Sequence, residues 1–563
     1  MSLINKDKKK KKLGSLRSSG GGSSVETSSL RPQFVEKRPP CGEGCPNHNQ
    51  IRKALMLIQK AEAYSKPYDQ VFEEAFYTFL ETTPFPSVCG RVCPHPCETE
   101  CNRKEKEGSV GINKFERYLG DYGLEKGLKP KFLTDEKRAE KIAVIGSGPA
   151  GISCAYHLAR RGYGVTVFEA FPKTGGMLRY GIPDYRLPQR ILDAEINRVA
   201  GMGVEIKVNT AVGHEISMND LRKDYKAIFV GIGAHTGYKL KIDGEDAPNV
   251  MTGVEFLNKI NSGETVDVGD HVVVVGGGDT AIDAARVARR LGAKSTILYR
   301  RTEAEMPAIE EEITGAREEG VEIHLLAAPI EIYKNGDLAT GMKCQKMELG
   351  EPDDSGRRRP VPIEGETFDL QFSTLIPAIS QAPNFDGFES LIEGRDWIKV
   401  DERNKSLKGN DVFAGGDNIN LGLVIDAIAH GKTAANSIHQ MISGEPIPVN
   451  GKQPGIIRFD KMKLSYYEEA QPVKATEMAS DERLKSLTAE ITATLAQEDA
   501  IAESKRCMSC GYCFDCGSCW SFCQDNAVIK PLVKGEHYKF KLEYCNGCSK
   551  CAENCPCGYI EMH

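Results

Sequence analysis

One stretch of the chain constrains the fold more than any other: residues 141–151 read as an apolar strand that runs into a G-x-G-x-x-G turn. Residues 152–162 then read as a helix, and residues 165–168 as a second strand that ends on Glu169. Glycines at the three positions let the backbone turn sharply, approach a pyrophosphate and pack helix on strand. The diphosphate then lies at the positive end of the helix, with Glu169 placed to accept from a ribose 2′-hydroxyl. This order of elements predicts a dinucleotide-binding α/β domain.

Two later segments complete this first nucleotide site. The glycine turn at 174–178 suits the close approach of a flat cofactor, and residues 411–417 read as a short strand ending in Gly-Asp. Asp417 is placed to accept from a ribityl hydroxyl, and a helix expected over 424–441 aims its N-terminus at the isoalloxazine carbonyls, where reduced flavin carries negative charge. The expected FAD-binding residues are Gly146, Gly148, Pro149, Ala150, Gly151, Glu169, Gly176, Leu178, Arg186, Gly416, Asp417 and Val424.

A second nucleotide motif begins at His271, with a strand over 272–275, a glycine turn over 276–281 and a helix over 282–291. The next strand, 296–299, ends on two arginines instead of an acid. Guanidinium groups bind a 2′-phosphate that a carboxylate would repel, so the site favours NADPH over NADH. Glu303 and Glu305 lie close enough to weaken this preference. The alternative is that the two arginines bind no phosphate and are only solvated residues that lead into a helix. The expected NAD(P)H-binding residues are Gly276, Gly277, Gly278, Asp279, Thr280, Arg300 and Arg301.

The 19 cysteines are concentrated at the two ends of the chain. Six lie between Cys41 and Cys101, eleven between Cys507 and Cys557, and Cys154 and Cys344 lie in the long middle. No signal-peptide hydrophobic region precedes them, so we expect metal or cluster ligation in a cytoplasmic protein and not disulfides. Cys154 falls inside the first nucleotide helix and reads as core. The absence of a redox C-x4-C after the first nucleotide motif argues against a disulfide reductase.

The C-terminal cysteines form the pair of runs found in two-cluster bacterial ferredoxins. The first three thiolates of a run bind one [4Fe–4S] cube, and the fourth reaches across to the other. A zinc site is the alternative for the C-x2-C pairs. Gln524 stands where a proline usually follows the fourth cysteine, and Cys557 is left without a role. We therefore assign one cluster to Cys513, Cys516, Cys519 and Cys555, and the other to Cys545, Cys548, Cys551 and Cys523.

These patterns predict the order of the domains. Apolar residues recur at helical spacing over 49–62 and 68–82, so the first cysteine-rich segment is expected to be helical. The expected fold is α/β: two nested Rossmann-like domains for FAD and NAD(P)H, an N-terminal α-helical iron–sulfur domain and a C-terminal α+β 2[4Fe–4S] ferredoxin domain. Residues 474–504 read mostly as a polar helix. The expected boundaries are a disordered or extended arm over 1–40, the helical iron–sulfur domain over 41–127, a linker over 128–140, the FAD domain over 141–250 and 391–445, the NAD(P)H domain over 251–390, a connector over 446–505 and the ferredoxin-like domain over 506–563.

Composition narrows the partners. A net charge of −6 on 563 residues leaves no nucleic-acid footprint, and no apolar run reaches the length of a transmembrane segment. The five lysines at 8–12 lie in a Ser/Gly-rich leader that reads as a solvated tail, with a membrane or partner arm as the alternative.

Residues 41 to about 470 resemble the small subunit of glutamate synthase and the N-terminal half of dihydropyrimidine dehydrogenase. The matching stretches are 41–46, 90–98, 176–183, 276–281 and 299–301. That family carries two [4Fe–4S] clusters in its N-terminal domain, bound with help from a C-x2-C pair just upstream. Here residues 1–40 contain no cysteine, and residues 503–511 resemble the missing segment moved to the other end of the chain.

The resemblance implies the remaining ligands. Cys507 and Cys510 would return to complete one cluster with Cys41 and Cys101. The second cluster would take three thiolates and the carboxylate of a glutamate. The alternative is that this glutamate is only a surface acid on a helix. Cys89 has the spacing to compete but is left out by analogy. This second set is Cys45, Cys93, Cys97 and Glu116, which brings the expected number of clusters to four.

The whole layout most resembles flavin NAD(P)H oxidoreductases associated with dissimilatory sulfite reductase. A flavin exchanges hydride with a nicotinamide and single electrons with iron–sulfur clusters, so it belongs between them. We expect electrons to pass between NAD(P)H and a redox protein, such as sulfite reductase or a ferredoxin, with no catalytic acid or base required. The main alternative is an electron-input subunit of a larger enzyme, and a third interpretation is a redox sensor or scaffold. The sequence does not indicate the oligomeric state.

Overall fold

The computed structural model describes residues 27–392, 397–445 and 453–563, and these form two compact units. The larger unit spans residues 38–456 and 469–508, and the smaller unit contains residues up to 37, 457–468 and 509–563. The prediction of a disordered stretch at the N-terminus lies mostly outside the described residues.

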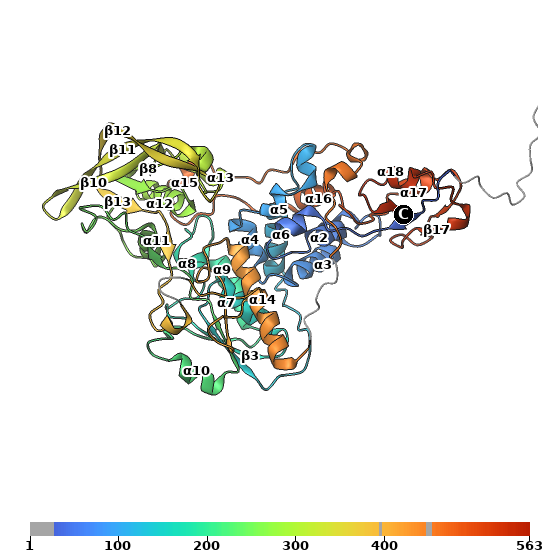
Figure 1. Cartoon of the computed structure of the whole chain (residues 1–563), viewed down its shortest axis with the longest axis horizontal. Coiled ribbons are helices and arrows are strands. Elements are labelled where there is room, and N and C mark those ends of the chain that lie inside the picture. The colour runs from blue at the N-terminus through green and yellow to red at the C-terminus, as the bar shows by residue number, and fades with distance from the viewer. Residues whose placement is uncertain (1–26, 393–396, 446–452) are drawn as a thin grey trace, which may run out of the picture. The chain divides into compact units, whose positions relative to one another are not determined.

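The larger unit begins with the helical cysteine-rich domain (Figure 1). Its helices bury an apolar core that also contains several of the cysteines. Helix α16, from the far end of the chain, packs against α2 and α6. The elements are α1 (Pro40–Gly44), α2 (Ile51–Gln59), α3 (Tyr68–Leu80), α4 (Pro86–Val92), α5 (Pro96–Thr99), α6 (Ile112–Glu125) and α16 (Gln497–Lys505).

A five-stranded parallel sheet in the order β15-β5-β2-β3-β4 carries the first nucleotide motif. Its central strands are almost wholly apolar and buried, as expected for a parallel sheet covered on both faces. Helices α7 and α14 pack side by side against this domain (Figure 1). The elements are β2 (Lys141–Ile145), α7 (Pro149–Ala159), β3 (Gly164–Phe168), α8 (Met177–Tyr180), α9 (Gln189–Ala200), β4 (Glu205–Lys207), α10 (Met218–Asp224), β5 (Ala227–Val230), β15 (Val412–Ala414) and α14 (Val424–Ser443).

The second nucleotide motif lies on a four-stranded parallel sheet in the order β13-β7-β8-β9, inserted between β5 and β15 of the first domain. A short antiparallel pair, β6 (Thr236–Gly237) with β14 (Gln381–Ala382), flanks the insertion. The predicted nesting of two Rossmann-like domains is confirmed. The other elements are α11 (Gly253–Asn261), β7 (His271–Val275), α12 (Asp279–Arg290), β8 (Lys294–Tyr299), α13 (Glu310–Glu318), β9 (Glu322–Leu325), an antiparallel sheet of β10 (Ala327–Asn335), β11 (Leu338–Pro352) and β12 (Arg358–Gln371), and β13 (Thr374–Pro377).

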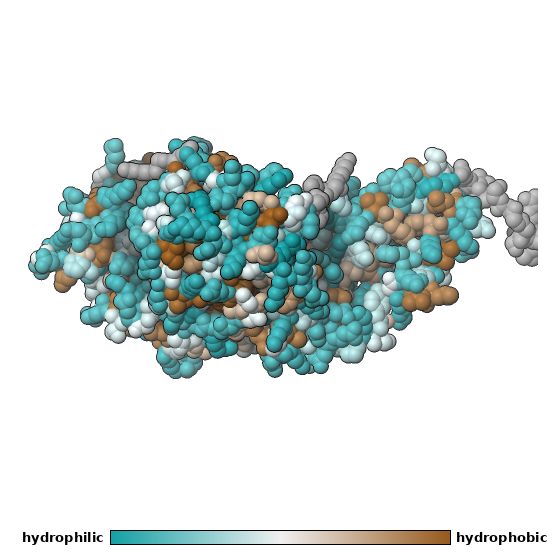
Figure 2. All heavy atoms as spheres, turned by 90° about the horizontal axis from the view of Figure 1, so that it is seen from below, coloured by the Kyte–Doolittle hydropathy of each residue, from teal (hydrophilic) through white to brown (hydrophobic). Residues whose placement is uncertain are grey.

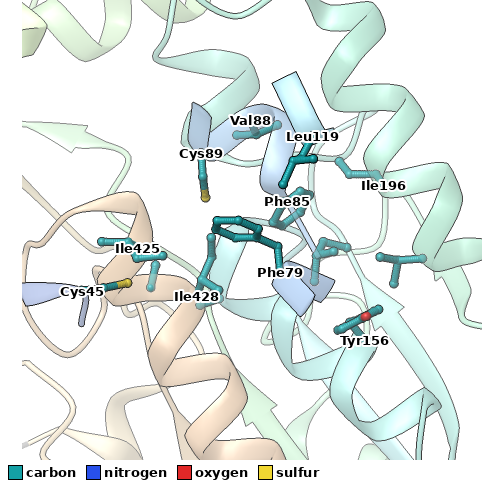
Figure 3. Packing of buried hydrophobic residues seen from close by; sticks show 14 of the residues in the cluster. Cys45, Phe79, Phe85, Val88, Cys89, Leu119, Tyr156, Ile196, Ile425 and Ile428 are labelled. Atoms are coloured by element: carbon teal, nitrogen blue, oxygen red, sulfur yellow. The ribbon is translucent and has the colours of Figure 1, made fainter. Parts of the chain in front are cut away.

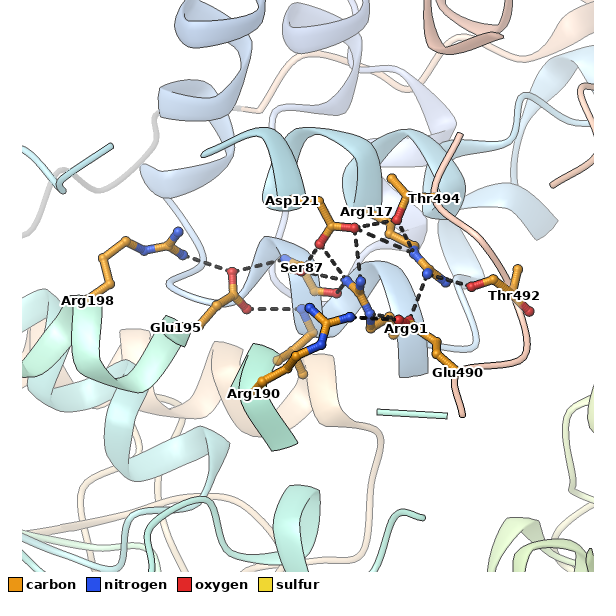
Figure 4. Close-up of polar contacts among 11 residues, drawn as sticks. Ser87, Arg91, Arg117, Asp121, Arg190, Glu195, Arg198, Glu490, Thr492 and Thr494 are labelled. Atoms are coloured by element: carbon orange, nitrogen blue, oxygen red, sulfur yellow. Dashed lines mark hydrogen bonds and ion pairs between the residues drawn. The ribbon is translucent and has the colours of Figure 1, made fainter. Parts of the chain in front are cut away.

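The predicted helix over 474–504 is wrong. Only α15 (Ser480–Arg483) and α16 are helical there, and the chain between them is largely extended. The Ile491 amide donates to the Tyr185 carbonyl, and Glu490 forms ion pairs with Arg91 and Arg117, each at 2.7 Å (Figure 4). Backbone and side-chain groups of this segment therefore bond to residues outside it, and the chain does not form the internal backbone hydrogen bonds of a helix.

The smaller unit holds the C-terminal cysteine runs on short elements. A strand from the N-terminal side, β1 (Pro32–Phe34), pairs antiparallel with β18 (Ile560–Met562). The other elements are α17 (Ser518–Ser521), β16 (Val528–Ile529), β17 (Lys539–Phe540) and α18 (Lys550–Glu553). Hydrophilic side chains cover most of the face seen in Figure 2, with hydrophobic ones in small areas.

Candidate functional site

The glycine turn between β2 and α7 has the shape of a phosphate cradle. A Cβ on Gly146 would lie 2.2 Å from the Gly231 carbonyl oxygen, and one on Gly151 would lie 2.0 Å from that of Gly146. Gly148 instead faces open space, because its nearest contact would be Gly176 Cα at 3.9 Å. Two glycines thus close the turn, and the third leaves room for a ligand at the start of α7.

A cavity of about 350 Å³ opens at this turn. Four of the expected flavin residues do not line it. Gly151 packs against the turn, Leu178 is buried, Val424 begins α14, of which Ala427 lines the cavity, and the fourth is Arg186. The expected residues that do line it are Gly146, Gly148, Pro149, Ala150, Glu169, Gly176, Gly416 and Asp417.

Arg186 lies away from this cavity. Its guanidinium forms ion pairs with Asp283 at 2.7 Å and with Glu312 at 3.0 Å, both in the second nucleotide domain. Two nearby carboxylates fix the side chain there, so its assignment to flavin is corrected.

Glu169 holds the glycine turn in place. Its carboxylate accepts from the Ser147 amide at 2.9 Å and from the Phe171 amide at 2.8 Å, at the end of β3 and on the cavity wall. Its role with a ribose stays a prediction.

Sequence reasoning missed His235, which also lines the flavin cavity. Its Nδ1 is buried and has no hydrogen-bond partner in the described part of the chain. Burial lowers the pKa of His235, and the nearby Glu169 opposes this, so the ring is neutral at pH 7. A buried nitrogen without a partner in a nucleotide cavity fits a polar ligand atom. The signal was faint: His235 follows the Gly-Ile-Gly segment after β5.

A second cavity, of about 540 Å³, opens at the turn between β7 and α12. Gly277 lies against an aromatic wall, since a Cβ there would meet the Tyr299 ring at 2.6 Å. Asp279 does not line the cavity but accepts from the Ile309 amide at 3.0 Å. The expected residues that line it are Gly276, Gly277, Gly278, Thr280, Arg300 and Arg301.

The two arginines after β8 differ. Arg301 is buried and bonds to Asp353 at 2.7 Å and to the Arg358 carbonyl at 2.7 Å, so its guanidinium is already engaged by the β11–β12 hairpin. Arg300 is exposed on the cavity wall, where Arg357 joins it. Sequence reasoning missed Arg357, because it lies 56 positions after Arg301 in the chain. Which of these arginines meets a 2′-phosphate stays a prediction.

The two glutamates that could have weakened this preference have other partners. Glu303 forms an ion pair with Arg317, and Glu305 accepts from the Thr302 amide at 3.2 Å.

Asp417 lines both cavities. It accepts from the Gly422 amide at 3.2 Å, just before α14. Burial raises the pKa of Asp417 to about 6. The two nucleotide sites thus meet at one side chain, where a nicotinamide and a flavin would exchange hydride.

The helical domain brings four of the predicted ligands together. Burial, Glu98 and then the thiols of Cys45 and Cys93 and the carboxylate of Glu116 raise the pKa of Cys97. Glu116 is 7% exposed, so the surface-acid alternative is wrong, and its pKa is raised well above the usual range by burial and by Glu195.

Cys89 is fully buried beside this group and remains a competitor for it. Burial, Glu116 and Cys93 raise the pKa of Cys89. Figure 3 shows the sulfurs of Cys45 and Cys89 near Phe79 and near Ile425 and Ile428 of α14. The flavin-domain helix thus reaches the predicted cluster site.

The segment before Cys507 packs onto the helical domain. Gln59 donates to the Cys507 carbonyl at 2.8 Å, and the Arg506 guanidinium donates to the carbonyls of Ser109 and Gly108, each at 2.7 Å. Arg506 also lowers the pKa of Cys101, which burial raises. Cys507 therefore lies in the same unit as Cys41 and Cys101, whereas Cys510 belongs to the smaller unit, and its part in their cluster stays a prediction.

In the smaller unit the thiols fall into two groups. Burial and then Cys516, Cys513 and Cys555 raise the pKa of Cys519. Burial raises the pKa of Cys551 to about 11, with Cys545, Cys523 and Cys548 contributing. The thiols are thus grouped as the ferredoxin spacing predicts, and the binding of a cluster by each group stays a prediction.

Cys557 lies at the edge of the first of these sets. Its Sγ is 3.8 Å from that of Cys555.

Among the described residues, no three His, Cys, Asp or Glu side chains lie close enough together to bind a single metal ion. A four-iron cube spreads its ligands more widely, and buried or half-buried thiols in sets of three or four fit it. When bound, the clusters supply one-electron transfer, the flavin links it to hydride transfer, and the chain's own residues hold and orient these groups.

No helix in the described ranges is long and apolar enough to cross a membrane.

Two family models match the chain. Residues 140–434 match pyridine nucleotide-disulphide oxidoreductase, and residues 34–128 match dihydropyrimidine dehydrogenase domain II, 4Fe-4S cluster. These ranges contain the two nucleotide domains and the helical cysteine-rich domain.

Curated relatives cover most of the chain. NADPH-Fe(3+) oxidoreductase subunit beta of Geobacter sulfurreducens is 35% identical over 85% of this chain and 76% of its own length. Glutamate synthase [NADPH] small chain of Escherichia coli is 36% identical over 71% of this chain and 88% of its own. NADP(+)-dependent formate dehydrogenase subunit beta of Moorella thermoacetica is 39% identical over 72% of this chain and 60% of its own.

Among solved structures, FprA of Mycobacterium tuberculosis in complex with NADPH has a TM-score of 0.48 and 17% identity, over 55% of this chain and 88% of that one. The matches in sequence, together with the two nucleotide cavities and the cysteine-rich domain, give the family. The chain belongs to the pyridine nucleotide-disulphide oxidoreductase family and is an NAD(P)H-dependent iron–sulfur flavoprotein oxidoreductase.

Proposed function

We propose that this chain takes hydride from NADPH at a flavin and passes single electrons through four [4Fe–4S] clusters to a redox protein. The observation that carries the proposal is Asp417, which lines both nucleotide cavities. Helix α14, which begins just after it, reaches the cysteines of the helical domain. A reaction that starts with two electrons and ends with one needs this order of cofactors.

NADPH is the proposed donor because Arg300 and Arg357 line the second cavity and no acid ends β8. Two cationic groups fit a 2′-phosphate. The names of the relatives from G. sulfurreducens and E. coli also contain NADPH.

The proposed cluster ligands are those predicted from the sequence. The helical domain would hold one cluster on Cys45, Cys93, Cys97 and Glu116 and another on Cys41, Cys101, Cys507 and Cys510. The proximity of the first four side chains supports the first set.

The test is anaerobic reduction of a one-electron dye by the purified chain, with NADPH and NADH compared at equal concentration. We expect NADPH to be the better donor and the dye to be reduced without another protein. Failure with both donors, in protein that retains flavin and iron, would refute the proposal.

A second candidate is an electron-input subunit that works only when docked on a larger enzyme. The relatives' names, which contain "subunit beta" and "small chain", favour it. Dye reduction by the chain alone, without activity toward any protein until a partner is added, would support it. The link to dissimilatory sulfite reductase rests on the layout of the domains, and an anaerobic pull-down with mass spectrometry tests it.

A further inference from the structure

Lys432 connects the flavin domain to the cysteine-rich domain. It lies on α14, whose residue Ala427 borders the flavin cavity. Its ammonium donates to the Asn47 carbonyl at 2.5 Å. Asn47 is two residues after Cys45, and the amides of Asn49 and Asn47 donate to the Cys45 thiol. A cation from the flavin-side helix thus stands beside a proposed cluster ligand.

This ammonium has no carboxylate partner among the residues that the structure describes. Burial lowers the pKa of Lys432 to about 8, and the Cys45 thiolate opposes that change. His157, which interacts electrostatically with Lys432, is buried, and burial keeps its ring neutral. The positive charge of Lys432 is therefore directed at the cysteine site and is not neutralised by a side chain of its own.

The loop that Lys432 holds is tied by side-chain hydrogen bonds and reaches the proposed carboxylate ligand. The side-chain amide of Asn47 donates to Asn49 Oδ1 at 2.9 Å and to the Thr82 carbonyl at 2.8 Å. The Thr82 hydroxyl also donates to Asn49 Oδ1, at 2.7 Å. Asn49 Nδ2 then lies 3.5 Å from Glu116 Oε1. Both asparagines are almost fully buried, so the network fixes the distance between the ammonium and the site.

We propose that Lys432 sets the reduction potential of the cluster held by Cys45, Cys93, Cys97 and Glu116, and so favours electron entry from the flavin side. Reduction of a cluster by one electron makes its net charge more negative by one unit. A fixed cation in a poorly solvated site stabilises the reduced form more than the oxidised form. Cluster potentials respond to local charge and hydrogen bonding in this way.

The experiment is an anaerobic redox titration of the whole protein, followed by electron paramagnetic resonance. It compares the wild type with Lys432→Met, which removes the charge at similar length, and Lys432→Arg, which retains it. We expect Lys432→Met to lower the potential of one cluster by at least a tenfold change in its reduction equilibrium, which is about 59 mV for one electron. Lys432→Arg should stay closer to the wild type, and the other clusters should not shift.

Lys259→Met is the matched control, since Lys259 is half-exposed on α11 and pairs with Glu255. Iron content is measured for each protein; if Lys432→Met loses iron, Lys432→Gln is titrated in its place. Unchanged potentials in a fully loaded neutral variant would overturn the proposal, as would a rise.

The inference rests on the ligand set proposed above. A wild type lacking this cluster would refute the ligand set, whereas a loaded cluster that does not shift would refute the role of Lys432 alone.

Discussion

Glu195 connects the flavin domain to helix α4, which carries Cys89 and is followed by Cys93, and its removal gives a quantitative test of the fold. Its side chain is fully buried on α9, and its carboxylate accepts from the Ser87 and Val88 amides at the start of α4, each at 3.0 Å (Figure 4). It also pairs with Arg198 at 2.9 Å. Two of the otherwise unpaired amides at this helix N-terminus are thus satisfied from another domain.

The magnitude follows from these contacts. A hydrogen bond to a charged acceptor is worth about 1.5–3 kcal/mol, so the loss of two costs about 3 kcal/mol or more. Arg198 would lose its carboxylate as well, and its Nε and Nη1 already lack partners within the described structure. Removing one member of a buried ion pair costs a similar amount, about 3–5 kcal/mol. We therefore expect Glu195→Ala to reduce the free energy of unfolding by about 3 kcal/mol and to release iron faster.

The assay is urea denaturation of the anaerobic protein, with iron release to a chelator measured in parallel. Glu195→Gln has nearly the same volume but replaces one accepting oxygen by an NH₂ group. Because this group would face a backbone amide that also donates, the variant should lose part of the same stability. Glu255→Gln, at an exposed pair, should change stability by less than about 1 kcal/mol. A Glu195→Ala protein as stable as this control would refute the reasoning.

Three further predictions follow from the cavities and the cysteine sites. Arg300→Ala should raise the KM for NADPH by roughly tenfold or more, because about 1.5 kcal/mol of charge-assisted bonding is lost. The KM for NADH should stay nearly unchanged. Equal effects on both KM values would contradict a contact between Arg300 and the 2′-phosphate. In flavin-free protein, burial raises the folded-state pKa of Asp417 to about 6, above its unfolded value of 3.8, so its contribution to stability falls as pH rises between these values. Asp417→Asn should therefore stabilise this form more at pH 7 than at pH 5 in urea denaturation, and a gain independent of pH would contradict the shift. Cys557→Ser should retain all of the iron, whereas loss of one cluster would make Cys557 a ligand.

The two nucleotide turns could be predicted from the sequence because their physics is local. A strand, three glycines and a helix follow one another in the chain, and the structure places Gly146 and Gly276 as expected. The grouping of the C-terminal thiols also depends on short spacings, while the clusters that these groups would bind stay a prediction.

The failures came from partners far away in the chain. Arg301 is engaged by Asp353 of a hairpin, and Arg186 by Asp283 of the inserted domain. Residues 474–504 have helical propensity but bond to the helical domain and to Tyr185 instead. No sequence pattern pointed to Glu195, because its role depends on how two domains pack.

The most direct test of the central claim is an anaerobic NADPH titration of the purified chain, monitored by flavin absorbance and by electron paramagnetic resonance. The account predicts FAD with about 16 iron atoms per chain, bleaching of the flavin and the appearance of reduced-cluster signals in the same protein. Flavin that bleaches while every cluster stays oxidised, or protein prepared without oxygen that holds neither flavin nor iron, would contradict it.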